Sequence, residues 1–106
     1  MPTIATVSID ARTPEGEPFT IRVEVGAPYQ RETGEWWSCP VALHGLYDHL
    51  ADASGEDSFQ ALCLAIRLAH YLLRDFREKG GELLSDGEQF PLDAYGLTVR
   101  KAEDEA

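Results

Sequence analysis

The sequence predicts an α+β fold, with an antiparallel sheet of about four to five strands in a meander and one long helix (about 58–79) on one face. Two observations predict it. Apolar and polar residues alternate through most of the first 26 positions, which is typical of half-buried strands. A long helical stretch then follows the strands, and strands that precede a helix favour segregated α+β architecture over βαβ winding.

The first two strands are expected at 3–11 and 18–26. Inward-facing apolar residues occupy every second position, namely Ala5, Val7, Ile9, Phe19, Ile21, Val23 and Val25. Between the strands, Pro14 fixes φ for a turn and Gly16 permits positive φ. The two strands are therefore predicted to form an antiparallel hairpin.

A third strand is expected over 36–43. Alternation places Trp37 on one face with Cys39, Val41 and Leu43, and Trp36 on the other. Only one tryptophan can then lie under the helix, and the other is covered by a loop, exposed or part of an interface. Pro40 cannot donate to a ladder, which indicates an edge, a bulge or an unpaired position.

The remaining strands are short. A fourth is expected near 46–51, after a turn at His44-Gly45. Two more, at 82–84 and 89–92, flank Ser85-Asp86-Gly87, and 97–99 is expected to add an edge strand.

The helix has clear start and stop signals. Asp57 is a suitable N-cap, and Gln60 three residues later completes a capping box. Gly80 and Gly81 supply a left-handed stop after it. Its apolar residues cover roughly 220° of the helical circumference, about twice what one sheet face requires. Either the sheet curls around the helix, the C-terminal segment covers its flank, or a second copy packs there in a homodimer.

The chain carries a net charge of −10. Such a balance argues against binding nucleic acid, which needs clustered Lys and Arg, and it suits a basic protein partner. The polar stripe of the helix is nevertheless basic. We take Arg67, His70 and Arg74, together with Trp36, as the candidate interface. The alternative is that this stripe pairs with neighbouring carboxylates.

No catalytic, cofactor or metal site is predicted. Cys39, His44 and His49 are spaced so that successive members of a strand face opposite sides, which does not suit a metal site. Cys63 and His70 share a helix face, but they lie two turns apart, too far for a hydrogen bond. Phosphate-binding glycine motifs are not found. We therefore expect no enzyme activity.

The chain is expected to be one domain over 1–100 with a disordered acidic tail at 101–106. The N-terminus does not resemble a signal peptide, and no apolar run approaches the length of a membrane span. The two cysteines are too few for a disulfide framework. These features predict a reduced, cytoplasmic protein without membrane contact.

Two patches carry a resemblance: Trp37-Ser38-Cys39-Pro40-Val41, and Gly55-Glu56-Asp57-Ser58-Phe59-Gln60-Ala61-Leu62 running into the apolar helix. With the leading hairpin, residues 3–85 resemble small uncharacterised bacterial proteins grouped as a domain of unknown function. The resemblance implies a bacterial cytoplasmic protein and favours an accessory or immunity-type role over an enzyme.

The function expected from the sequence is non-catalytic protein binding, in its most concrete form an acidic immunity or inhibitor-type protein that neutralises a basic partner. The alternative is a homodimeric domain that binds a small ligand in a groove between helix and sheet.

Overall fold

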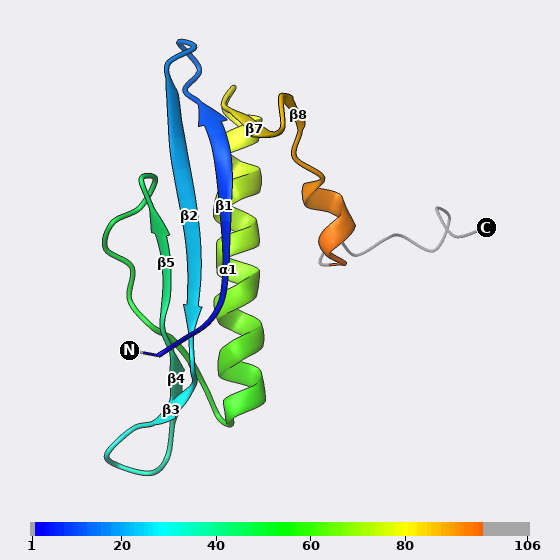
Figure 1. The fold of residues 1–106 in the computed structure, drawn as a ribbon. Coiled ribbons are helices and arrows are strands. Elements are labelled where there is room, and N and C mark those ends of the chain that lie inside the picture. The colour runs from blue at the N-terminus through cyan, green and yellow to red at the C-terminus, as the bar shows by residue number, and fades with distance from the viewer. Residues whose placement is uncertain (1, 97–106) are drawn as a thin grey trace, which may run out of the picture.

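The computed structural model describes residues 2–96, and within them the fold is α+β, as predicted. Figure 1 shows one long helix lying along one face of the sheet. The elements are β1 (Thr3–Arg12), β2 (Pro18–Gly26), β3 (Tyr29–Gln30), β4 (Trp37–Cys39), β5 (Val41–His44), β6 (Ala53–Gly55), α1 (Ser58–Glu78), β7 (Glu82–Ser85), β8 (Glu88–Gln89) and the 3₁₀ helix η1 (Leu92–Tyr95). In this part of the chain the strands form a five-stranded sheet in the order β5-β2-β1-β7-β8 and a three-stranded sheet in the order β3-β4-β6.

The predicted hairpin is confirmed. β1 pairs antiparallel with β2, with Val7 opposite Val23 and Ile9 opposite Ile21. These apolar residues face α1, and Ile9 and Ile21 are almost fully buried. The register shifts between Thr3 and Ala5, so the pairing at the start of β1 is irregular.

Pro40 divides the predicted third strand into β4 and β5. β5 pairs with β2 in the larger sheet, whereas β4 pairs with β3 and β6 in the smaller one. Because proline offers no N–H, it fits the point where the chain leaves one ladder and enters the other. Its carbonyl still accepts from the N–H of Gly26 at 2.9 Å.

The strand expected near 46–51 is wrong. This segment contributes only an isolated bridge between Leu43 and Tyr47, and the next strand is β6. The segment has little alternation and holds Asp48 and His49 at exposed positions, so it lacks a face to bury.

Short strands were predicted at 82–84 and 89–92; β7 matches the first, but β8 ends at Gln89 and Leu92 begins η1. β7 and β8 form a hairpin around Asp86-Gly87, whose positive φ values of 51° and 82° suit a two-residue turn. The order departs from a continuous meander here, because β7 pairs with β1 rather than with β5. The predicted strand at 97–99 and the predicted tail at 101–106 lie outside the described residues.

The helix begins and ends close to the predicted bounds. The Asp57 carboxylate accepts from the Gln60 N–H at 2.7 Å, as expected of an N-cap. The Gln60 side chain accepts from the Glu56 N–H at 2.7 Å, one residue earlier than a standard capping box. After the last turn, Gly80 has φ 102°, and its N–H donates to the Arg77 carbonyl at 3.1 Å.

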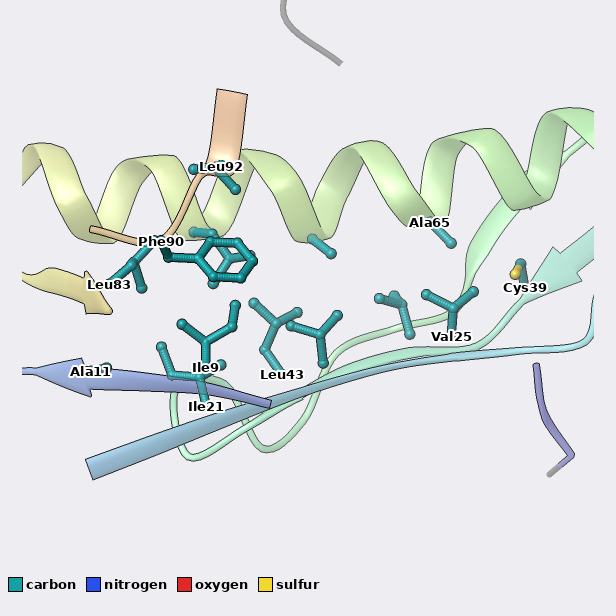
Figure 2. Close-up of a cluster of buried hydrophobic side chains, with 14 of the residues drawn as sticks. Ile9, Ala11, Ile21, Val25, Cys39, Leu43, Ala65, Leu83, Phe90 and Leu92 are labelled. Carbon is teal, nitrogen blue, oxygen red and sulfur yellow. The ribbon is translucent and has the colours of Figure 1, made fainter. Parts of the chain in front are cut away.

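The core lies between α1 and the sheets (Figure 2). Ala61, Ala65 and Ala69 recur every fourth residue and are buried, so small side chains let the helix approach the strands closely. Phe90 lies between the helix and Ile9 of β1 (Figure 2), and Leu92 is also buried. The C-terminal segment thus covers one flank of α1, one of the three ways of covering the helix that the sequence left open.

Other apolar residues of the helix stay exposed. Phe59 and Tyr71 are 75% and 62% exposed. Leu64 and Ile66 are also partly open to solvent. The described residues therefore bury only part of the apolar surface of the helix that the sequence predicted.

Candidate binding groove between the helix and the first strand

A groove of about 240 Å³ runs between α1 and the first part of β1. Its floor comes from β1 and β2, its wall from α1 and its lip from the segment after β8. The lining residues are Ala5, Thr6, Val7, Ile9, Val23, Val25, Ile66, Ala69, His70, Leu73, Phe90, Leu92 and Tyr95. Almost all of these side chains are apolar, so the groove is suited to an apolar molecule.

Thr6, His70 and Tyr95 carry the polar side-chain groups of this lining, and of the three only His70 is buried. The helix carries it onto the buried side, and its side chain is only 8% exposed. Its Nε2 is buried and has no hydrogen-bond partner among the residues that the structure describes. A buried polar atom without a partner costs about 1–3 kcal/mol, which marks this atom as a candidate ligand contact.

The lip of the groove is fixed mainly by packing. Leu92 is buried, and the Phe90 and Tyr95 rings stack with centroids 5.4 Å apart. The Asp93 carboxylate in η1 lies 3.8 Å from the Arg77 guanidinium and 4.0 Å from that of Arg74. Asp93 is largely exposed, so these contacts contribute little to the position of η1. Tyr95, 52% exposed, lies at the open side of the groove.

The structure separates the residues predicted as one interface. His70 turns into the groove, so the expectation that it shares an exposed stripe with Arg67 is wrong. Arg67 is exposed, whereas Arg74 is half-buried and lies near Asp93. For Arg74 and Arg77, pairing with a neighbouring carboxylate, the alternative stated above, is what the structure shows. The helical angle and the polarity of His70 grouped it with the arginines. Neither gives information on the segment after β8, which packs across that flank of the helix.

Trp36 belongs to a different region. It is 48% exposed just before β4, whereas Trp37 is half-buried against the core, which answers the question of which tryptophan is buried that the sequence left open. Trp36 lines an open hollow of about 940 Å³ with Tyr29, Arg31 and Ser54. The Tyr29 hydroxyl donates to the Asp52 carboxylate at 2.7 Å. Among the described residues, none that lines this hollow has a buried side-chain atom without a hydrogen-bond partner, so the hollow has no atom comparable to His70 Nε2.

The cysteine and histidines weighed as metal ligands lie apart. The Cys39 thiol is buried and donates to the Gly26 carbonyl at 3.2 Å. Burial, with a smaller effect from the Asp52 carboxylate, raises the pKa of this thiol. His44 lies on the solvent face of β5, with Nε2 2.9 Å from Glu24. Within residues 2–96 there is no cluster of three or more His, Cys, Asp or Glu side chains arranged to hold a metal.

Glu24 is held by several groups on the solvent face of the sheet. The Thr3 hydroxyl donates to it at 2.9 Å, and Arg22 lies 2.7 Å away. The Thr3 hydrogen bond, followed by the charges of Arg22 and His44, lowers the pKa of this carboxyl despite some opposing desolvation. This cluster ties β1, β2 and β5 together and lies on the face opposite α1.

The fold and the groove define a small α+β domain with an apolar site beside its helix. The chain belongs to the DUF6968 family, described as a domain of unknown function, whose model matches residues 9–99. The predicted relationship to a domain of unknown function is thereby confirmed. No curated protein and no solved structure matches the chain. Within the described residues, α1 is not apolar enough over a sufficient length to span a membrane.

Proposed function

We propose that this domain is a non-catalytic binding module that takes a small, largely apolar ligand in the groove between α1 and β1. The observation that carries the proposal is the buried Nε2 of His70, which has no hydrogen-bond partner among the described residues and lies in a largely apolar lining. A ligand that brings one hydrogen-bonding group to this atom removes its desolvation cost, and its apolar body fills the rest.

The size of the groove limits the ligand. At about 240 Å³ it exceeds the roughly 150 Å³ cavity that accommodates benzene in a protein interior. A molecule of two fused rings, or a short branched chain, with one hydroxyl or carbonyl matches these dimensions. The open side at Ala5 and Tyr95 provides the entry, because both side chains are exposed.

The test uses naphthalene and 2-naphthol as probes, since they differ by one hydroxyl. We expect both to bind and 2-naphthol to bind about 2- to 12-fold more tightly, the equivalent of one net hydrogen bond of 0.5–1.5 kcal/mol. His70→Leu should abolish this preference, whereas His49→Leu, at an exposed position, should keep it.

A blocking variant completes the design. Ala5 is exposed and lines the groove, so Ala5→Phe fills the space from its solvent side without entering the core. It should weaken both probes. Equal affinity of the two probes for the wild type, or unchanged binding in both His70→Leu and Ala5→Phe, contradicts the proposed site.

A second proposal is that the domain binds a basic protein, as an immunity or inhibitor-type protein does. Figure 1 places the β1–β2 and β7–β8 turns at the same end of the molecule. Both turns carry exposed carboxylates, namely Glu15, Glu17, Asp86 and Glu88. A pulldown in about 0.1 M salt, where charges still act over ~10 Å, should recover a basic protein, and neutralising these four residues should release it. Equal recovery by the neutralised variant contradicts this second proposal.

The proposal includes a cytoplasmic location. Support comes from the two free cysteines, Cys39 and Cys63, because reducing compartments keep such thiols unpaired.

A further inference from the structure

Within residues 2–96, β1 has an open edge along most of its length. β2 pairs with it from Thr3 to Arg12 apart from the register shift at Ile4, but β7 pairs only with Asp10, Ala11 and Arg12. In Figure 1, β7 reaches β1 at one end, and the rest of β1 runs on without a strand beside it on that side. Among the described residues, 3–9 therefore have a strand partner on one side only.

The pairing pattern shows which backbone groups face this edge. Arg12 lies opposite Pro18, which has no N–H, so we assign this as a non-hydrogen-bonded pair. Alternation then directs the N–H and C=O groups of Ala5, Val7 and Ile9 toward β2. Those of Thr6 and Ser8 point to the open edge.

This edge lacks the usual protection against strand pairing. Residues 3–9, Thr-Ile-Ala-Thr-Val-Ser-Ile, contain no charge and no proline, and five of the seven are β-branched, namely Thr3, Ile4, Thr6, Val7 and Ile9. By contrast, the outer strand β8 is two residues long and begins with Glu88. The edge of β5 is crossed by the bridge from Leu43 to Tyr47.

We propose that a second copy of this chain pairs antiparallel with β1 along this edge, joining the two five-stranded sheets into one. The segment is compatible with itself. Centred on Thr6, the pairing places Thr6 opposite Thr6 of the other copy on the solvent face. Ala5 then lies opposite Val7 of the other copy on the apolar face.

Two further observations favour a second copy as the occupant. The pairing segment is uncharged, so two copies approach along it without bringing carboxylates together, although each chain has a net charge of −10. Apolar side chains also remain exposed beside the edge: Ile4 is 53%, Ile66 36% and Tyr95 52% exposed. An incoming strand covers part of this surface.

The test is the molar mass in solution, measured by light scattering over a range of concentrations. We expect the mass of two chains for the wild type and of one chain for Ser8→Pro. Proline at Ser8 removes the edge N–H without removing a bond to β2, and proline is tolerated on edge strands. Ser8→Ala is the matched control, because it keeps the N–H, and it should retain the mass of two chains.

Amide hydrogen exchange provides a second measurement on the unaltered protein, in case Ser8→Pro does not fold. The amides of Thr6 and Ser8 should exchange slowly at high concentration and at least tenfold faster on dilution. Those of Val7 and Ile9, bonded to β2, should change little. A one-chain mass at all concentrations, or a two-chain mass in folded Ser8→Pro, overturns the proposal. Protected Thr6 and Ser8 amides in a one-chain species also overturn it, because a segment of the same chain then fills the edge.

Discussion

The His70→Leu variant tests whether the groove contains a buried polar atom without a hydrogen-bond partner. In the structure, His70 Nε2 is buried with no partner in the described residues, and such an atom destabilises a fold by about 1–3 kcal/mol. Leucine removes the polar atom and leaves a branched apolar side chain of similar volume but different shape in the groove that Val7, Ile66 and Leu73 also line. Part of the gain is lost to this change in packing, so we expect a net stabilisation of about 1 kcal/mol.

The assay is reversible unfolding by heat and by urea, without ligand. A gain of 1 kcal/mol raises Tm by about 4–8 °C in a domain of this size. The urea midpoint should rise while the slope of free energy against urea stays constant, because the exposed area on unfolding is nearly unchanged. A loss of more than 1 kcal/mol would refute the reasoning, since it would mean that Nε2 has a partner in the free protein. Stabilisation combined with lost probe preference would show that His70 serves binding at the expense of stability.

Three other predictions follow from single residues. Because the pKa of Glu24 is lowered in the folded state, its carboxylate stabilises the fold above the ordinary carboxyl pKa, and this stabilisation is lost as the pH falls through the folded-state pKa. The free energy of unfolding, measured at a series of acidic pH values, should therefore fall less with decreasing pH in Glu24→Gln than in the wild type. Cys63 is exposed and Cys39 is buried with a raised pKa, so Ellman's reagent should titrate one thiol rapidly in the native protein and two after denaturation; two rapid thiols would contradict the placement of Cys39. Gly55→Ala should destabilise the fold by about 2 kcal/mol or more, because a Cβ there lies 2.7 Å from the Ala61 nitrogen. Gly87→Ala is the control, since its Cβ meets no atom within 4 Å and the only cost is the positive φ of the residue. Equal losses of stability in the two variants would place β6 farther from α1 than the structure does.

Local signals in the sequence predicted the elements whose energetics are local. The alternation of β1 and β2 fixes which side chains face the helix, and Asp57 and Gly80 mark the helix ends because capping depends on neighbouring backbone groups. Period-two alternation grouped Trp37 with Cys39, Val41 and Leu43, but it left open which tryptophan is buried, and the structure packs Trp37 against the core. Pro40 correctly signalled a break in pairing.

The groove depends on contacts between distant segments, and the sequence carries little information on these. His70 is buried because Phe90 and Leu92 pack beside the same flank of α1, twenty or more positions later. From the sequence, a polar residue on the same helix face as arginines is expected to be exposed, because the position of the later segment is not known. The pairing of β7 with β1 has the same origin, since three residue pairs far apart in the chain decide it. One available signal was that a histidine occurs on a helix whose apolar residues are unusually abundant.

The most direct test of the ligand groove is chemical-shift mapping with 2-naphthol on the isotopically labelled protein. We expect the largest chemical-shift changes at Val7, Ile66, Ala69, His70 and Tyr95, including a change in the imidazole Nε2 resonance of His70. Changes centred instead on Tyr29, Arg31 and Trp36, which line the open hollow near β4, would contradict it.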